Sequence, residues 1–149
     1  YVGPALEIMK STDLDIALIA GRFTLLDQVA QHDLFPYALA NKIDISMGGV
    51  LNSGVLANPV AGATYNYLPA ADEVIARAAK IGNFLKERGI PLVAAALQFP
   101  LRHPAVTSVL TGPRTAAELR SNAEDFDRVI PAHIWSELED AGLIEKIQA

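Results

Sequence analysis

Val106-Thr107-Ser108-Val109-Leu110-Thr111-Gly112-Pro113-Arg114-Thr115-Ala116-Ala117-Glu118 joins a β-branched run to the start of a helical pattern. A strand that ends in a Gly-Pro-Arg turn and leads into a helix presents backbone N–H groups beside a fixed cation, an arrangement suited to binding an anion. Thr115 and Glu118 also fit a capping box. An ordinary βα turn with a surface arginine explains the same residues, so both interpretations stay open.

Two further apolar runs, at residues 16–20 and 43–47, predict strands that alternate with helices. The first run is nearly continuous and suits a strand buried on both faces, as in a parallel sheet covered by helices. Helices are expected at residues 5–10, 34–41, 71–88, 91–99 and 116–126, and from Pro131 onward. This alternation predicts an α/β fold with right-handed crossovers and about three parallel strands.

A sheet of only three parallel strands has two open edges, which parallel sheets rarely leave uncovered. No Gly-x-Gly-x-x-Gly follows the first strand, so the dinucleotide-binding Rossmann fingerprint is absent. Three βα units instead match slightly less than half of an eight-stranded (β/α)8 TIM barrel. The long connection at residues 54–69 lacks regular periodicity, and such loops are usually functional or mobile.

Composition narrows the functional classes. The 149 residues are 51% hydrophobic and 19% charged, which predicts one domain with a sizeable core and excludes disorder. A net charge of −5 without a basic stripe argues against nucleic acid or an anionic membrane as partner. The absence of cysteine excludes disulfides, thiolate nucleophiles and sulfur-ligated metals.

Targeting and metal signals are equally sparse. No apolar run reaches about 18 residues and no signal peptide is visible, so we expect a cytoplasmic protein. The three histidines lack metal-ligand spacing, and no metal is expected. The first residue is Tyr1 rather than methionine, which predicts that the chain is a piece of a longer protein.

A resemblance to a known family covers essentially the whole chain. It rests on residues 22–26, 49–56, 91–101 and 103–112 and on Glu118, Leu119 and Asn122. The last stretches resemble the C-terminal signature of aldo-keto reductases, in which a small-residue helix, a strand ending in a Gly turn and a helix carrying an Asn follow one another. The first two are similar to the branch that includes aldose and L-fucose dehydrogenases and pyridoxal 4-dehydrogenase.

The resemblance implies the C-terminal part of an eight-stranded barrel that binds NAD or NADP at the C-terminal ends of its strands. The implied reaction is reversible hydride transfer between the cofactor and a carbonyl or hydroxyl carbon of a sugar or a small aldehyde or alcohol. The family's catalytic Asp, Tyr, Lys and His lie in the first half of the barrel, so we expect no catalytic residue here. The chain alone is then inactive, and its natural partner is the N-terminal half. Because the edges of its sheet are open, we expect the isolated fragment to form a homodimer or swapped assembly.

The same resemblance assigns cofactor-binding roles. Around the pyrophosphate it places Asn52, Ser53 and Gly54, with backbone N–H groups and the serine hydroxyl as donors. Many members carry an aromatic residue beside the nicotinamide, where this chain has Gly48 or Gly49. Leu51, or a residue of the missing N-terminal half, takes its place. The residues implied around the adenosine are Gly112, Pro113, Arg114, Thr115 and Glu118, with Asn122 at the adenine edge.

Glu118 bears on the choice between NAD and NADP. A carboxylate near the ribose repels a 2′-phosphate and accepts from a 2′-hydroxyl, which favours NAD. Closing the capping box is an equally good explanation of Glu118. Arg22 and Phe23 end the first strand and contact substrate or nicotinamide, or only pack. The alternatives to an enzyme are a non-catalytic nucleotide-binding or regulatory module and a plain structural α/β domain.

Overall fold

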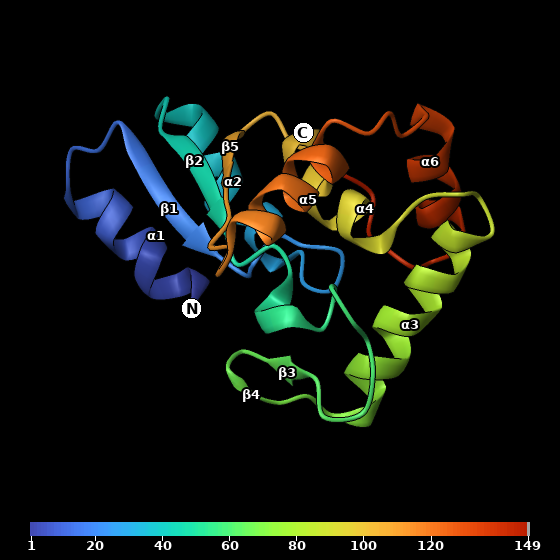
Figure 1. The fold of residues 1–149 in the computed structure, drawn as a ribbon. Helices are drawn as coiled ribbons and strands as arrows, with labels where there is room; N and C mark the ends of the chain where they lie inside the picture. The colour runs from blue at the N-terminus through green and yellow to red at the C-terminus, as the bar shows by residue number, and fades with distance from the viewer. Residues whose placement is uncertain (149) are drawn as a thin grey trace.

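Three parallel strands form the centre of the molecule. The computed structural model describes residues 1–148. In it β1 (Ile16–Ala20), β2 (Asp44–Gly48) and β5 (Val106–Leu110) pair in the order β1-β2-β5, as Figure 1 shows. Both pairings are parallel, and Met47 lies opposite Ile19 on one side and Val109 on the other. The predicted parallel arrangement is confirmed, with β2 displaced by one residue from the predicted range.

Helices follow the strands in the predicted order. They are α1 (Val2–Ser11), α2 (Leu34–Ala40), α3 (Asp72–Lys86), α4 (Leu92–Gln98), α5 (Ala116–Phe126) and α6 (Ala132–Asp140), with short 3-10 turns η1 (Val29–Gln31), η2 (Asn52–Gly54) and η3 (Phe99–Arg102). Helix α2 packs against α1 and β2, while α4 lies between α3 and α5. No helix within residues 1–148 has the length and apolar character needed to cross a membrane.

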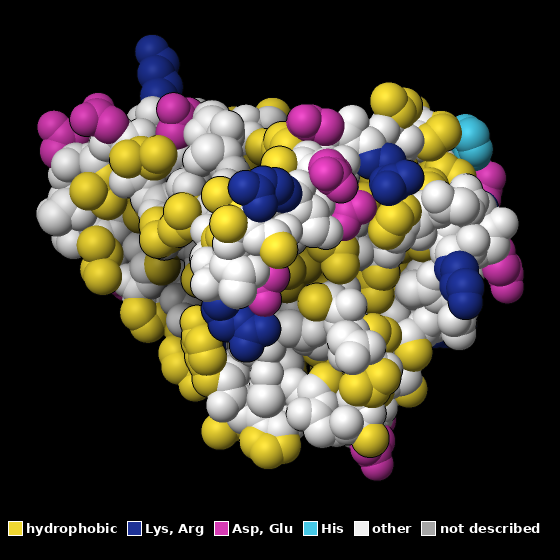
Figure 2. Space-filling model, viewed as in Figure 1, with side chains coloured by type: hydrophobic (Ala, Val, Ile, Leu, Met, Phe, Trp, Pro, Cys, Tyr) yellow, Lys and Arg dark blue, Asp and Glu magenta, His cyan; other side chains and the backbone are white. Residues whose placement is uncertain are grey.

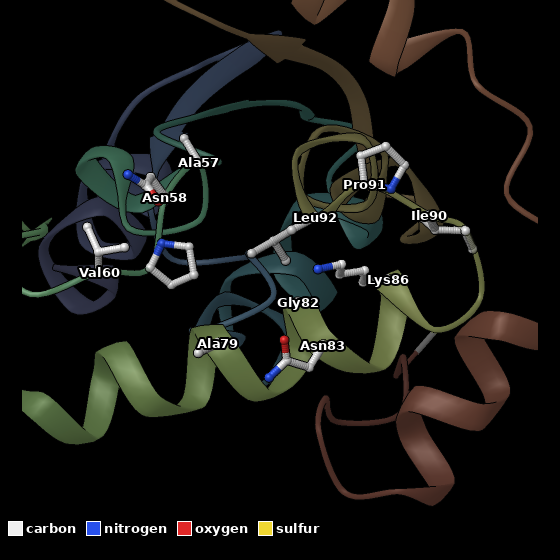
Figure 3. A pocket seen from close by; sticks show the side chains of 12 residues that line it. Ala57, Asn58, Val60, Ala79, Gly82, Asn83, Lys86, Ile90, Pro91 and Leu92 are labelled. Atoms are coloured by element: carbon white, nitrogen blue, oxygen red, sulfur yellow. The ribbon is translucent and has the colours of Figure 1, made fainter.

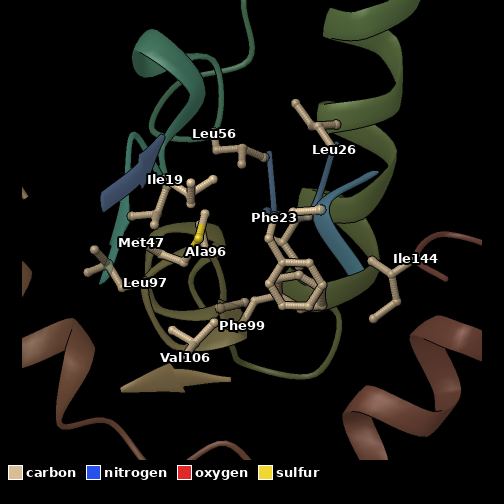
Figure 4. Packing of buried hydrophobic residues seen from close by; sticks show 14 of the residues in the cluster. Ile19, Phe23, Leu26, Met47, Leu56, Ala96, Leu97, Phe99, Val106 and Ile144 are labelled. Atoms are coloured by element: carbon tan, nitrogen blue, oxygen red, sulfur yellow. The ribbon is translucent and has the colours of Figure 1, made fainter. Parts of the chain in front are cut away.

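The hydrophobic core lies on one face of the sheet. Ile45 and Met47 of β2 are fully buried there, together with Phe23, Phe35 and Phe99. Figure 4 shows Met47, Phe23 and Phe99 converging beneath Ile19 and Leu56. The Phe23 ring meets Phe35 edge-on, with the ring centroids 4.9 Å apart. Burying each such side chain contributes about 1.5–3 kcal/mol, so this cluster is the main source of the fold's stability.

His103 belongs to this core rather than to any metal site. The side chain is fully buried, and its ring lies 4.6 Å from the Phe35 ring. Ala105 donates its N–H to Nδ1, and Nε2 lies 2.7 Å from the Gln148 carbonyl oxygen. Burial lowers the pKa of His103, which keeps the ring neutral among its aromatic neighbours.

The opposite face of the sheet is open. Ile16 and Leu18 of β1 are 54% and 57% exposed, and Leu110 of β5 is 55% exposed. Between them the Ser108 hydroxyl donates to Ser46 Oγ at 2.9 Å. The expectation that the 16–20 strand is buried on both faces is therefore wrong for this chain. Its apolar side chains alternate between two faces, and within residues 1–148 only one face is covered.

The long connection after β2 carries structure that the sequence pattern did not reveal. Strands β3 (Thr64–Tyr65) and β4 (Leu68–Pro69) form a small antiparallel hairpin. Its turn residues Asn66 and Tyr67 have φ values of +50° and +64°, the left-handed geometry of a tight hairpin turn. Two-residue strands are too short to produce an alternating pattern, and the turn is Asn-Tyr rather than Asn-Gly.

Candidate functional site

A cleft of about 680 Å³ opens at the carboxyl edge of the sheet, between the loop after β2 and the start of α5. Most of the residues predicted to bind cofactor line it: Leu51, Ser53, Gly54, Gly112, Pro113, Arg114, Glu118 and Asn122. The two loops meet because β2 and β5 are parallel neighbours, with Gly48 opposite Leu110. The loops that follow two such strands leave from the same edge of the sheet.

The floor of this edge depends on a close backbone approach between two glycines. Gly21 N–H donates to the Gly48 carbonyl oxygen at 2.9 Å, which joins the ends of β1 and β2. Gly49 has a φ of +63°, and a Cβ there would lie 3.2 Å from Gly21 N. Both the left-handed backbone and the short approach require glycine at position 49.

Turn η2 contains consecutive left-handed residues. Asn52 and Ser53 have φ values of +46° and +58°, a conformation that non-glycine residues rarely adopt. Such strain persists only where the surroundings impose it, and it clusters at functional sites. The turn is therefore a candidate for contact with a ligand.

Two of the backbone N–H groups of η2 that were expected to donate to a ligand are already used within the turn. The N–H groups of Asn52 and Gly54 donate to the carbonyl oxygens of Gly49 and Leu51, at 2.9 and 3.0 Å, so they hold the turn itself. The Ser53 hydroxyl oxygen accepts from Tyr67 N at 3.0 Å. That contact leaves the hydroxyl proton available, since Ser53 Oγ donates to no group within residues 1–148. Within residues 1–148 the Ser53 hydroxyl is therefore a side-chain donor of this turn that a ligand can use.

The Asn52 side chain does not line the cleft, although its neighbours Leu51 and Ser53 do. Asn52 is only 3% exposed and lies under the turn beside Gly21. Neither Nδ2 nor Oδ1 has a hydrogen-bond partner within residues 1–148. A buried carboxamide without partners costs about 1–3 kcal/mol. Its unused donor and acceptor add to the strain that marks η2.

Glu118 closes the cap of α5. The Thr115 hydroxyl accepts from Glu118 N at 3.1 Å, while Thr115 itself stays outside the cleft. Glu118 Oε2 accepts from Arg114 N at 2.7 Å, and Oε1 from Arg114 Nη2 at 3.0 Å. Chiefly the backbone N–H of Arg114, and then its guanidinium, lower the pKa of Glu118. The Thr115 half of the predicted capping box is confirmed, whereas the Glu118 carboxylate accepts from Arg114 N rather than from the capping residue Thr115. Glu118 also lines the cleft.

Arg22 follows the carboxyl end of β1 and does not line the cleft, and the hairpin holds its side chain. Its Nη1 pairs with Asp27 Oδ2 at 2.6 Å, and its Nη2 donates to Asn66 Oδ1 at 2.9 Å. Tyr65 OH lies 3.5 Å from the same Asp27 oxygen, and burial together with the nearby carboxylate raises the pKa of Tyr65. Since Thr64 Oγ1 also donates to Ser53 O at 2.6 Å, the hairpin ties the end of β1 to η2.

Phe23 is a predicted site residue that lies away from the cleft, and α5 adds cleft residues that were not predicted. Phe23 is fully buried in the core, which agrees with its packing interpretation. Several cleft residues were not among the predicted site residues, and two of them, Ser121 and Asp125, lie on α5. The spacing of Glu118, Asn122 and Asp125 places them on one face of α5, and this signal could have identified Asp125.

The surface has no concentrated charge on the face in view. Figure 2 shows basic and acidic side chains interspersed among hydrophobic ones over α4 and α5. Within residues 1–148 no three or more histidine or acidic side chains lie together in a way that could hold a metal ion. The cleft presents the exposed Arg114 guanidinium together with the carboxylates of Glu118 and Asp125.

Comparison with known proteins yields one family model and two relatives. The model of the aldo/keto reductase family matches residues 4–142. Pyridoxal 4-dehydrogenase from Microbacterium luteolum is 41% identical over 139 residues, which cover 93% of this chain and 41% of that protein. D-threo-aldose 1-dehydrogenase from Pseudomonas sp. is 39% identical over 138 residues, covering 91% and 42%. The chain thus spans about two-fifths of the length of these curated relatives.

Proposed function

Because this chain belongs to the aldo/keto reductase family, we propose that it forms the nucleotide-holding part of an NAD(P)-dependent dehydrogenase. The observation that carries the proposal is the single cleft shared by the loops after β2 and β5. The family resemblance assigns the pyrophosphate to one of these loops and the adenosine to the other. The bound cofactor would accept or supply the hydride, and this chain's residues would bind and orient it.

The residues of the cleft fit a dinucleotide. A Cβ at Gly54 or Gly112 would meet nothing within 4 Å, so a ligand can approach the backbone closely at both loops. The Ser53 hydroxyl is available to a phosphate oxygen. The Arg114 side chain is 88% exposed and can pair with a phosphate or stack on adenine. Asn122 lines the same cleft, in reach of a base edge.

We favour NAD over NADP. Glu118 faces the cleft as a carboxylate whose lowered pKa keeps it charged. A 2′-phosphate placed there meets a like charge, whereas a 2′-hydroxyl can donate to it. The Arg114 guanidinium offsets part of the negative charge of Glu118. The preference for NAD over NADP therefore depends on whether the ribose lies beside Glu118 or beside Arg114.

The substrate we propose is a small carbonyl compound or aldose. The two relatives are named for pyridoxal and for D-threo-aldoses. Arg22 would form part of the substrate wall, since Asp27 and Asn66 hold it at the carboxyl end of β1. The acid-base residues that the resemblance implies belong to the first half of the barrel, so the 149-residue chain alone should not turn over substrate. We expect the protein in the cytoplasm.

Binding of NAD tests the proposal directly. Calorimetric titration should show that Ser53→Ala weakens NAD binding about ten- to a hundredfold, the effect of losing a hydrogen bond to a charged group. Arg120→Ala is the matched control, because Arg120 is exposed on α5 but does not line the cleft. Equal affinities for the natural protein, Ser53→Ala and Arg120→Ala would contradict the assigned site.

Activity measurements distinguish an enzyme from a non-catalytic nucleotide-binding module. The full-length polypeptide should oxidise aldoses or pyridoxal with NAD, and the 149-residue chain should not. A full-length protein that binds NAD but oxidises no member of an aldose and aldehyde panel would favour a nucleotide-binding regulatory module.

A further inference from the structure

We propose that a second hollow, between α3, the start of α4 and residues 57–60, binds a small organic anion with an apolar body. This outer groove has a volume of about 550 Å³. Its walls are residues 57–60, the start of α4 and one face of α3, as Figure 3 shows. The inference concerns a different cleft from the nucleotide site and does not rest on the proposed function.

The shape of the outer groove follows from small and rigid residues. Ala79, Gly82, Asn83 and Lys86 are spaced so that they share one face of α3. A Cβ on Gly82 would lie 3.3 Å from Leu92 Cδ2, so glycine leaves room for the start of α4 to come close. The hollow therefore exists in the folded chain without rearrangement of either helix.

The opposite walls are apolar. Pro59 and Val60 line one side, and Ile90, Pro91 and Leu92 line the other. Val60 is 51% exposed, so its side chain is accessible to a ligand in the groove. An apolar ligand body would remove this surface from water.

The polar groups of the outer groove are donors without partners. No carboxylate within residues 1–148 pairs with the Lys86 ammonium, and the Asn58 and Asn83 carboxamides make no side-chain hydrogen bond there. Figure 3 shows Lys86 extended along the groove toward Leu92. One cation beside two carboxamides matches a single small anionic head, such as a carboxylate, better than the several charges of a nucleotide.

The outer groove adjoins the nucleotide cleft without overlapping its donors. Ala57 lines both hollows. Ala57 N and Asn58 N both donate to the Gly54 carbonyl oxygen, at 2.9 and 3.0 Å, so this wall is anchored on turn η2. Ser53, Arg114 and Glu118 do not line the outer groove. Ligands in the two hollows should therefore bind at the same time.

The test uses 4-phenylbutyrate as the anionic probe and 4-phenylbutanamide as its neutral counterpart. The full-length polypeptide with labelled Leu and Val methyl groups is titrated by NMR, after assignment of Val60, Leu92, Val93 and Leu110 by single substitutions. 4-Phenylbutyrate should shift the Val60 and Leu92 signals, with and without NAD present. Lys86→Gln should weaken its binding about three- to fivefold, the range for one exposed ion pair, and leave the amide unaffected.

Two controls make the outcome decisive. Lys80→Gln removes a lysine from the same helix outside the outer groove and should leave the affinity unchanged. Ala79→Leu fills the groove and should abolish the Val60 and Leu92 shifts, while an unchanged circular dichroism melt shows that the fold persists. Shifts confined to Val93 and Leu110, which line the nucleotide cleft, would overturn the proposal. So would equal losses in Lys86→Gln and Lys80→Gln, or equal affinities for the acid and the amide.

Discussion

Gly49 shows how one residue shapes the carboxyl edge of the sheet. Gly49→Ala should lower the free energy of unfolding by about 2–4 kcal/mol, because it combines a left-handed backbone with a tight contact against the backbone of Gly21. Urea denaturation measures this loss.

Gly89 provides the matched control for Gly49. It has a similar φ of +73°, but a Cβ there would meet nothing within 4 Å. Gly89→Ala should therefore cost only about 1–2 kcal/mol, the conformational part alone. If both variants lost the same stability, the close approach of Gly21 and Gly49 would have no energetic role.

Glu118 decides the cofactor preference in our interpretation. Glu118→Arg should shift the ratio of NAD to NADP affinity toward NADP about ten- to a hundredfold, because a cation replaces the carboxylate beside the ribose. Calorimetry with both cofactors on the full-length polypeptide measures the ratio. Glu118→Gln is the control that removes the charge but keeps a side-chain acceptor for Arg114 N. An unchanged ratio in both variants would leave Glu118 as a cap only.

Acidification should remove the contribution that the Glu118 carboxylate makes to stability. Folding lowers the pKa of Glu118, so its contribution to stability is complete above the usual glutamate pKa and disappears as the pH falls through the lowered value. The difference in melting temperature between the natural protein and Glu118→Gln should therefore shrink on acidification.

At the scale of the elements, α5 depends on its cap more than on packing. None of its residues is buried, and Leu119 and Phe126 are 54% and 39% exposed. Thr115→Ala removes the acceptor for Glu118 N and should destabilise α5 by about 1 kcal/mol. Hydrogen exchange should accelerate in α5 but not in the core strand β2, and Thr115→Ser should restore protection. Equal acceleration in β2 would mean that α5 unfolds only with the whole molecule.

At the scale of the whole molecule, the open sheet face predicts self-association of the isolated chain. Ile16, Leu18 and Leu110 form an exposed apolar surface, and the outer edges of β1 and β5 pair with no strand in the described part of the chain, residues 1–148. Such edges and surfaces associate, so the 149-residue chain should form a homodimer at micromolar concentration. Light scattering after size exclusion measures the mass, and Leu18→Lys should shift it toward the monomer. A natural chain that remains monomeric would contradict the prediction.

The sequence by itself determined the elements and the family. Apolar runs and caps are local signals, so the strands, most helix bounds and the Thr115–Glu118 cap followed from nearest neighbours along the chain. The family model and the two relatives confirm the resemblance and the branch read from the motifs. The position of the cleft residues at one edge of the sheet was predictable too, because the loops that follow neighbouring parallel strands leave from the same edge.

Tertiary structure alone decided what each side chain faces. Asn52 lies buried beside Gly21, Arg22 pairs with Asp27 and Asn66, and one face of β1 stays open. Each of these depends on residues distant in sequence that approach only after the sheet has formed. The hairpin that binds Ser53 likewise consists of strands too short to leave a periodic pattern. Local patterns specify which elements form, whereas burial and partners depend on how those elements pack.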